Sequence, residues 1–398
     1  MDLPKAIHEL EYNHGSIYGS EEAEALLEVL RASAPSCGAK VKEFEEAFAA
    51  YCGCEYGLAV TSATAGLELA MIAAGAGPGD EVITTPISWI STANAAVIRG
   101  ASMVFADVDP RTLNIDPASI AAKVTDRTKV ILLVHLYGHP CDMAPIQDLA
   151  RKHNLLIIED CAHAPGAEYR GTKTGNLGDI GVFSFHQQKN MVTLGEGGMI
   201  TTNDCGLYEA MLSFRSLCAR TYDPKGKYLP IDESVQPMGK RYWHLDFADV
   251  GYNFRMTDAQ AAVGLVQLKK LNANNARRAE IAAIYTERLS GIPGLTLPEV
   301  SPVVKHAWHI YSVQIGPEFP LTKEEFMWEM YVGKRIKVWS HYMPIHLTSA
   351  YRALGHRPGE CPVAEEAFER YVSLPIHPRL TEEGIGHLVS SVRALSTQ

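Results

Sequence analysis

The sequence predicts an α/β protein with a mostly parallel sheet covered by helices on both faces, followed by a smaller α+β domain. Three observations support this fold class. The chain has 398 residues, 46% of them hydrophobic and 21% charged, which is enough for a sizeable core and two or three domains. Helical and β-branched segments alternate between residues 20 and 250. Several β-branched segments are apolar at nearly every position, as strands buried on both faces are.

The expected elements follow one another along this first part of the chain. Helices are predicted at 21–32 and 43–51, and in the second the side chains of Phe44, Phe48 and Tyr51 recur on one helical face. Short runs rich in β-branched residues predict the strands. These runs lie at 81–86, 102–108, 129–136, 155–160, 181–185 and 198–202. Because ligands of open α/β sheets bind beyond the carboxyl ends of the strands, the polar residues found there are the candidates for function.

The pattern changes after residue 250. Thr257 and Gln260 have the spacing of a capping box and predict a helix over 256–271. A second helical stretch at 281–289 ends in the breaker-rich segment 290–294. The remaining C-terminal residues, which include a capped helical segment TKEEFMWEM at 322–330, predict a small α+β domain. We therefore expect three parts, namely an N-terminal arm at 1–20, a large α/β domain at 21–272 and a small C-terminal α+β domain at 273–398.

Charge and cysteine content restrict the class of protein. Lys plus Arg number 36 and Asp plus Glu 46, for a net charge of −10, which is a poor match for a phosphate backbone. The eight cysteines are scattered without a C-x-x-C pair, as reduced cytosolic thiols are. The N-terminus has no signal-peptide pattern, and apolar runs such as 130–138 are too short to span a membrane. We expect a cytoplasmic protein with neither nucleic acid nor a membrane as its partner.

The densest chemical signal lies at 178–202. A predicted strand ends at Ser184, a short turn carries Lys189, and a G-E-G-G segment at 195–198 leads into the next strand. Burial lowers the pKa of a lysine amine, and such an amine can form a Schiff base with a carbonyl compound. The alternative is an ordinary surface lysine in a loop, which is the commoner situation.

Asp160 ends the apolar segment 155–160, where an unpaired carboxylate would be costly. One interpretation is a helix cap or a structural salt bridge. The other is a partner for the protonated pyridine nitrogen of pyridoxal phosphate (PLP), which keeps that ring cationic and able to absorb electrons.

Two weaker signals precede Asp160 in the chain. Ser62, Ala63 and Thr64 open an apolar helix, and their backbone N–H groups and hydroxyls could hold a phosphate. Ordinary N-capping explains the same residues. Trp89 follows the strand at 81–86 and could stack on an aromatic cofactor, although core packing is the commoner use of a single tryptophan.

Taken together in this order along the chain, these signals resemble the motifs of a known protein family. The motif EDCAHAPGA at 159–167 and the pair SFHQQKN and GEGG at 184–198 are highly specific, and VGYNFRM at 250–256 and SHYMPIH at 340–346 extend the match. The sequence resembles the DegT/DnrJ/EryC1/StrS family of PLP-dependent sugar and cyclitol aminotransferases over nearly its whole length. The resemblance implies the type I aminotransferase fold, with a mostly parallel, seven-stranded type of sheet. It also implies a homodimer whose active sites lie at the subunit interface.

The resemblance implies a role for each candidate residue. Lys189 would form the Schiff base with the cofactor, and Asp160 would face the pyridine nitrogen. Two residues depart from the family pattern: Ala63 replaces a usual glycine, and His163 replaces a usual glutamine against the phenolic oxygen of the ring. The other implied contacts are stacking by Trp89, phosphate binding by Ala63, Thr64 and Ser184, phosphate binding by Asn253 from the other subunit, and substrate contacts by His341 and Tyr342.

The expected activity is transfer of an amino group from glutamine or glutamate to the keto group of a sugar or cyclitol, in amino-sugar or aminoglycoside-type secondary metabolism. The cofactor would alternate between PLP and pyridoxamine 5′-phosphate. The alternatives are a dehydrating or aromatising PLP reaction on the same fold, or a catalytically silent relative that binds a partner protein. An NAD-binding protein is disfavoured because no G-x-G-x-x-G joins a strand to a helix.

The histidines near the C-terminus do not predict a metal site. His306, His309, His341 and His346 have no cysteine or carboxylate cluster beside them at ligand spacing. No metal is therefore expected.

Overall fold

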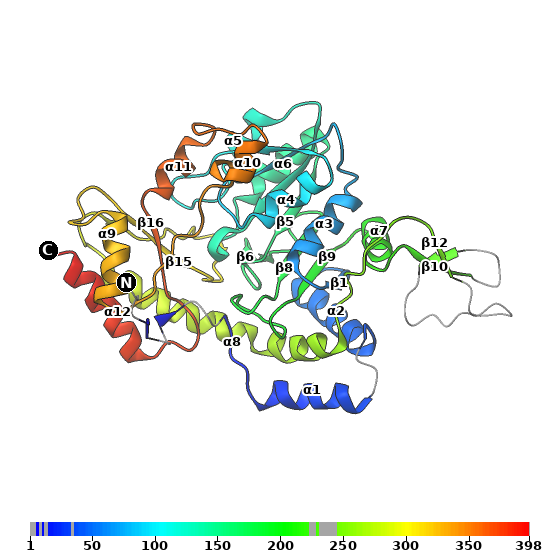
Figure 1. Ribbon diagram of the computed structural model, residues 1–398, viewed down its shortest axis with the longest axis horizontal. Helices are drawn as coiled ribbons and strands as arrows, with labels where there is room; N and C mark the ends of the chain where they lie inside the picture. The colour runs from blue at the N-terminus through cyan, green and yellow to red at the C-terminus, as the bar shows by residue number, and fades with distance from the viewer. Residues whose placement is uncertain are drawn as a thin grey trace.

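The computed structural model describes residues 5–7, 10–11, 15–32, 36–222, 228–230 and 245–397. Part of the predicted N-terminal arm therefore lies outside the described residues. A large α/β region and a smaller α+β region are joined by the long helix α8 (Asp258–Leu289), and a small antiparallel sheet projects from the large region (Figure 1). None of the helices that the structure describes is both long enough and apolar enough to cross a membrane.

The large region is built on a seven-stranded sheet in the order β1-β9-β8-β5-β4-β2-β3. The five strands from β8 to β3 are parallel, and β9 is antiparallel to both of its neighbours. This confirms the predicted fold class. The bounds are β1 (Tyr56–Val60), β2 (Glu81–Thr84), β3 (Ser102–Phe105), β4 (Thr128–Val134), β5 (Leu156–Asp160), β8 (Ile180–Ser184) and β9 (Gly198–Thr202).

Successive residues of the central strands enter different cores, which explains their continuous apolar sequence. In β4, Val130 and Leu132 belong to the core shared with α3 and α4, whereas Ile131 and Leu133 belong to the core shared with α5 and α6. Further along the sheet, α2 and α8 cover the second face. The helices of this region are α2 (Ala39–Cys52), α3 (Ala63–Ala73), α4 (Ser91–Ile98), α5 (Pro117–Lys123), α6 (Met143–His153) and α7 (Cys205–Arg215).

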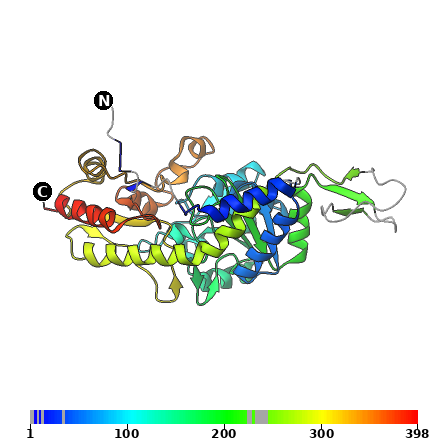
Figure 2. The same cartoon turned by 90° about the horizontal axis from the view of Figure 1, so that it is seen from below.

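Helix α8 begins at the predicted capping box, in which the Thr257 hydroxyl and the Gln260 side chain are both engaged. The two helical stretches expected at 256–271 and 281–289 are one continuous helix. The predicted division at 272 falls inside it, and the three-part division of the chain stays a prediction. Figure 2 shows α1 (Ser20–Ala32) beside the first part of α8 and α12 (Glu382–Leu395) beside its last part.

The smaller region packs its own core against the last turns of α8. Ile281, Tyr285 and Leu289 contact the inner faces of β15, β16 and α12 there. The predicted capped helix after 321 is present, with Thr322 as its N-cap. The remaining bounds are α9 (Lys323–Trp328), α10 (Ser349–Ala353), α11 (Pro362–Phe368), β13 (Leu295–Thr296), β15 (Tyr311–Ile315) and β16 (Tyr371–Leu374), and in the two other small sheets β6 (Glu168–Tyr169), β7 (Thr172–Lys173), β14 (Val304–Lys305), β10 (Ala219–Tyr222), β11 (Tyr228–Pro230) and β12 (Leu245–Phe247).

Candidate active site

A cavity of about 510 Å³ lies at the carboxyl ends of β4, β5 and β8, beside the N-termini of α3 and α4. This is where an open α/β sheet binds its ligands. Every predicted site residue except Asn253 lines the cavity. Those residues are Ser62, Ala63, Thr64, Trp89, Asp160, His163, Ser184, Lys189, His341 and Tyr342. Asn253 is exposed, its backbone pairs with Ser216, and it does not line this cavity.

Lys189 lies in the turn between β8 and β9, and its own backbone N–H donates to the His186 carbonyl at 2.8 Å. Burial lowers the pKa of its amine to about 8, and the nearby Asp160 carboxylate acts in the opposite direction. The turn is held closely by the N-terminal arm, since a Cβ at Gly15 would lie 1.9 Å from the Lys189 carbonyl oxygen. Lys189 is therefore a partly buried residue with an enclosed amine on a fixed backbone, and not an ordinary surface lysine.

Asp160 ends β5 and is buried. The Thr92 hydroxyl donates to its Oδ2 at 2.8 Å, and the Ala162 N–H donates to its Oδ1 at 3.0 Å. Burial raises the pKa of this carboxyl, while these two donors and the Lys189 ammonium act against the rise. Sequence reasoning missed Thr92, because the residue on which it acts, Asp160, lies 68 positions further along the chain.

The N-terminus of α3 forms the opposite end of the cavity. The Ser62 hydroxyl accepts from the Ala65 N–H at 3.2 Å, and the N–H groups of Ala63 and Thr64 belong to a first turn that has no intrahelical acceptors. Ser184 ends β8 and pairs with Gly198 of β9. A Cβ added at Gly198 would lie 2.8 Å from the Ala63 nitrogen. The glycine thus lets the sheet approach the helix terminus closely. Hydroxyls, N–H groups and the positive end of a helix dipole fit a phosphate here.

His163 lies between two aromatic side chains. Its ring stacks on His309 at a centroid distance of 4.4 Å, and its Nε2 lies 3.2 Å from the Tyr342 hydroxyl. Burial, together with the charge of Lys189, holds the pKa of His163 well below its usual range. The Tyr137 N–H donates to its Nδ1 at 3.4 Å, so that the proton of the neutral ring is on Nε2.

The remaining wall of the cavity is aromatic. Trp89 is 61% exposed and meets Tyr342 edge to face at 6.0 Å, so it is not a core residue. His341 Nδ1 lies 2.9 Å from the Ser373 hydroxyl, and burial lowers the pKa of His341 to about 3. His163 and His341 are therefore both neutral near pH 7.

Asn190, which follows Lys189, was not singled out from the sequence. Its Nδ2 donates to the Ala307 carbonyl at 2.7 Å and to Asn275 Oδ1 at 3.0 Å, and its Oδ1 lies 3.1 Å from His309 Nδ1. The side chain therefore ties the lysine turn to α8 and to the segment before β15. These partners are distant in sequence, and nothing in the motif itself could have identified them.

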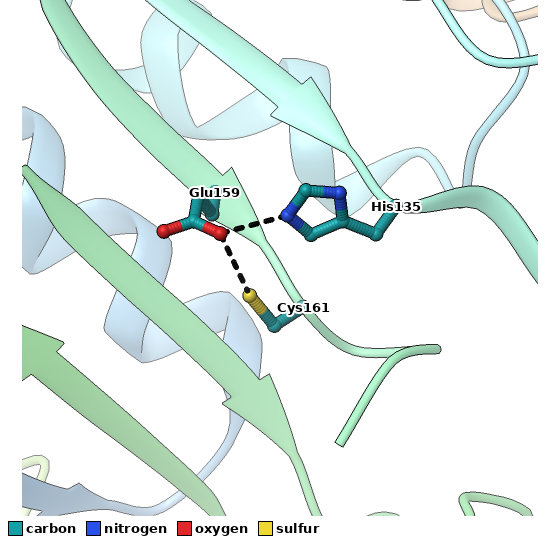
Figure 3. Close-up of side chains that lie close together, drawn as sticks. All are labelled: His135, Glu159 and Cys161. Carbon is teal, nitrogen blue, oxygen red and sulfur yellow. Dashed lines mark hydrogen bonds and ion pairs between the residues drawn. The ribbon is translucent and has the colours of Figure 1, made fainter. Parts of the chain in front are cut away.

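Three buried side chains behind Asp160 lie close enough to suggest a metal site: His135, Glu159 and Cys161 (Figure 3). Glu159 Oε2 is 2.8 Å from His135 Nε2 and 3.9 Å from Cys161 Sγ. Each candidate ligand is already engaged, however. Glu159 accepts from the backbone N–H groups of Gly175, Leu177 and Gly178, and His135 Nδ1 accepts from that of Cys141. This bonding favours a structural role without a metal, because binding an ion would displace it.

A buried amine of lowered pKa, a buried carboxyl, a helix N-terminus suited to a phosphate and an exposed indole line one cavity, and this is the set of groups that a PLP-dependent aminotransferase needs. The chain matches the DegT/DnrJ/EryC1/StrS aminotransferase family over residues 16–393 and belongs to that family. This confirms the resemblance seen in the sequence.

Individual relatives cover nearly the whole chain. The GDP-perosamine synthase of Caulobacter vibrioides is 39% identical over 358 residues, 90% of each protein. The aminotransferase from Psychrobacter cryohalolentis has a TM-score of 0.88 at 34% identity, covering 95% of this chain and 97% of that one. Spr1654 from Streptococcus pneumoniae, solved in a PLP-form, has a TM-score of 0.87 at 25% identity, covering 100% of this chain and 99% of that one.

Pyridoxal 5′-phosphate is the cofactor of this enzyme, with pyridoxamine 5′-phosphate as its aminated form. The residues of the cavity fit this group: the α3 terminus and Ser184 suit its phosphate, Asp160 its ring nitrogen, and Lys189 its aldehyde. When bound, the cofactor supplies a ring that takes up the electron pair released as a C–H bond of the amino donor breaks.

Proposed function

We propose that this enzyme transfers an amino group from glutamate or glutamine to the keto carbon of a sugar, in the biosynthesis of an amino sugar. The observation that carries the proposal is the buried Lys189 amine sharing one cavity with Asp160 and the N-terminus of α3. The similarity to a GDP-perosamine synthase supports a sugar as the acceptor. A cyclitol is the alternative acceptor with the same keto chemistry.

In this proposal Lys189 moves the proton. With a pKa of about 8, roughly a fifth of its Nζ amine is neutral near pH 7.4. It can therefore remove the α-proton of the amino donor and return a proton at the cofactor's reactive carbon, and the acceptor half-reaction runs these transfers in reverse. The Asp160 carboxylate holds a proton on the pyridine nitrogen, and the Thr92 hydroxyl holds that carboxylate in place.

The other residues bind and orient. The first-turn N–H groups of α3 and the Ser184 hydroxyl hold the phosphate, and the half-exposed face of Trp89 covers the ring. His163 donates from Nε2 to the phenolic oxygen. Because its pKa lies well below the usual range, His163 remains a neutral donor throughout the physiological range.

We further propose a homodimer in which Asn253 of one chain binds the cofactor phosphate in the other. Asn253 is exposed and does not line its own chain's cavity. The match of GYNFRM to the family motif supports its role across the interface.

A screen of purified enzyme with PLP, glutamate or glutamine, and a panel of keto-sugars and keto-cyclitols tests the proposal. We expect a new amino product from a keto-sugar, with release of the corresponding keto acid. Lys189→Ala should give neither product, and Asp160→Asn should lower kcat by about 100-fold or more because the ring nitrogen loses its charged partner. Dehydrated or aromatised products without amination would contradict the proposal and support the alternative chemistry.

A further inference from the structure

A second histidine ring lies directly behind His163, and the proposed proton transfers do not use it. The ring of His309 stacks on that of His163 with a centroid distance of 4.4 Å and an angle of 29° between the planes. His163 is among the described residues that line the cavity, whereas His309 is buried behind it. An influence of His309 on the cofactor therefore passes through a neighbouring side chain.

Hydrogen bonds determine which nitrogen of His309 carries the proton. Asn190 Nδ2 lies 2.7 Å from the Ala307 carbonyl, which can only accept, so Asn190 turns its Oδ1 toward His309. Asn275 is oriented in the same way, because its Nδ2 donates to the Pro165 carbonyl at 2.8 Å and its Oδ1 accepts from Asn190 at 3.0 Å. Asn190 Oδ1 lies 3.1 Å from His309 Nδ1. The proton of the neutral His309 ring is therefore on Nδ1.

The backbone of Tyr137 connects the two histidines. Its N–H donates to His163 Nδ1 at 3.4 Å, and its carbonyl accepts from the His309 N–H at 2.9 Å. Tyr137 has a φ of 59°, in the left-handed region that residues other than glycine rarely adopt. Strain of this kind persists where the surrounding structure requires it, and it often marks a functional site. Here it turns a donor toward His163 and an acceptor toward His309.

The surroundings keep both rings neutral. Burial holds the pKa of His309 well below its usual range, and four neighbouring groups add to this effect: His163, Lys189, Arg278 and His341. Burial also holds the pKa of His163 well below its usual range, with Lys189 and His341 acting in the same direction. An imidazole, unlike an amide, can exchange its tautomer or take up a proton. At this pair the hydrogen bonds fix the tautomers and the surroundings exclude the added proton.

We propose that His309 is a positioning residue for the cofactor, whose ring aims the Nε2 proton of His163 at the phenolic oxygen and keeps that donor neutral. This inference rests on the proposed contact of His163 with the phenolic oxygen. The other group that faces Nε2 is the Tyr342 hydroxyl at 3.2 Å, and burial raises its pKa, so it is neutral as well. A neutral donor stabilises the ionised form of the phenolic oxygen. It therefore lowers the pH at which the enzyme-bound cofactor loses its proton.

The absorbance of the bound cofactor as a function of pH tests this role. His309→Asn keeps a side-chain N–H for Asn190 but removes the ring that stacks on His163. The midpoint of the pH-dependent absorbance change should rise by about one pH unit, because the phenolic oxygen loses an aligned donor. His309→Phe keeps a flat, neutral ring in the stack and should restore most of the wild-type midpoint. An unchanged midpoint in His309→Asn, or equal shifts in both variants, would overturn the inference.

His306 provides the matched control. Its ring stacks on Trp308 at a centroid distance of 4.0 Å, and it is not among the residues that line the active-site cavity. His306→Asn therefore removes a stacked histidine ring from the same segment of the chain. It should lower the unfolding free energy without moving the absorbance midpoint. A midpoint that moves as far in His306→Asn as in His309→Asn would show that loosening of this segment is the cause, against the proposal.

A double variant shows whether His309 acts through His163. His163→Gln retains a donor toward the cofactor but presents no imidazole to the stack. In this background His309→Asn should move the midpoint no further, since the effects of two residues that act as a unit do not add. Shifts that add in the double variant would mean that His309 acts by another route, and the inference would fail. Urea unfolding of each variant verifies that the proteins compared are folded.

Nitrogen-15 NMR of the histidine-labelled holoenzyme gives a readout that does not depend on activity. The signals of His163 and His309 are assigned by their loss in His163→Gln and His309→Asn. Between about pH 6 and 8 both rings should stay neutral, with the proton on Nε2 of His163 and on Nδ1 of His309. Asn190→Ala removes the acceptor of the second proton and should allow His309 to exchange its tautomer. A charged imidazolium at either ring, or the opposite tautomer, would contradict the proposal.

The outcomes also separate this inference from the function on which it rests. If the enzyme aminates no keto-sugar or keto-cyclitol, yet the midpoint shifts in His309→Asn and recovers in His309→Phe, the proposed function fails and the positioning role stands. If the enzyme aminates a keto-sugar and the midpoint does not respond to His309, the function stands and the positioning role fails.

Discussion

The environment of the Lys189 amine changes its acid–base chemistry in a direction that suits proton transfer. Its pKa falls from 10.5 to about 8 because the protonated form is buried. Between these two values the unfolded chain binds more protons than the folded apoprotein, so the stability contribution of this residue rises with pH over that window. At pH 7 the buried charge costs the folded apoprotein up to roughly 3 kcal/mol, a figure that already includes its attraction to Asp160.

We therefore expect Lys189→Met to raise the unfolding free energy of the apoprotein at pH 7, and the gain to shrink as pH approaches 10. Urea unfolding across this pH range measures both effects. Lys152→Met on the exposed surface of α6 reports the effect of removing a solvated lysine. A gain in the Lys189 variant that stays constant with pH would show that charge burial is not its cause.

A second prediction concerns Thr92, whose hydroxyl donates to Asp160 at 2.8 Å. Thr92→Val removes this donor, and the pKa of Asp160, already raised by burial, should rise further. Since hydrogen bonds to charged groups contribute about 1.5–3 kcal/mol, kcat should fall about 10-fold or more. Thr92→Ser keeps the hydroxyl and should keep most of the activity, and equal losses in both variants would argue for packing instead. The pH dependence of kcat is the measurement.

At this scale the sequence located the residues that lie in contiguous motifs, because strand ends and helix starts bring such motifs to one edge of a parallel sheet. It did not locate Thr92, Asn190 or the stacking of His309 on His163. Each of these acts through a partner at least 60 residues away in the chain. A single sequence contains no signal for such pairs.

Among the elements, those with strong local signals were predicted correctly. The six expected strands and the capping boxes at Thr257 and Thr322 are present. Strand β1 was missed because its sequence, YGLAV, includes Gly57, a poor strand former. That glycine is needed, since a Cβ there would lie 2.4 Å from the Glu45 carbonyl oxygen. The middle of α8 was not predicted to be helical because it is polar. In the structure the side chains of Asn275 and Arg278 are buried there and donate to backbone carbonyls of residues far away in the sequence.

The ends of β4 and β5 depend on one carboxylate, which gives a prediction at the element scale. Glu159 accepts hydrogen bonds from His135 and from three backbone N–H groups of the segment 175–178. Glu159→Gln places amide hydrogens against some of these donors, and the unfolding free energy should fall by about 3 kcal/mol. Glu168→Gln, at a more exposed ion pair with Lys305, should change it by less than about 1 kcal/mol.

Chelation tests the same cluster for a metal. The bonding of His135, Glu159 and Cys161 favours a site without an ion. Dialysis against EDTA should therefore leave both the unfolding transition and the activity of the enzyme unchanged. A transition that shifts down with EDTA and recovers with added zinc would contradict the structural interpretation of Glu159.

In the whole molecule, segments from both ends of the chain meet behind the lysine turn. Arg278 of α8 is fully buried and donates to carbonyls far apart in sequence, among them those of Gly15, Trp308 and Ile376. Gly15 in turn lies against the Lys189 carbonyl. The catalytic turn is thus fixed by the N-terminal arm, the long helix and the smaller region together, so the geometry of the site depends on the complete fold.

Asn253 is the predicted site residue that this fold does not bring to the cavity, which leads to a prediction about the assembly. If Asn253 completes the site of a partner chain, Lys189→Ala and Asn253→Asp variants should each be inactive, the second because its carboxylate repels the phosphate. Mixing them with subunit exchange pairs an intact Lys189 with an intact Asn253 in one site of each mixed dimer. Activity should then recover to about a quarter of the wild-type value, since half of the dimers carry one working site.

The matched control carries both substitutions in a single chain. In a mixed dimer of the wild type and the double variant, the site that has an intact Lys189 receives the altered residue 253 from the double variant. That site should be inactive, so the total activity should fall below the activity that the wild-type chains show alone. With Asn253 acting within its own chain, the two single variants would regain nothing on mixing. The double variant would then leave the wild-type sites untouched. Specific activity after exchange, together with the mass of the assembly from light scattering, separates the two arrangements.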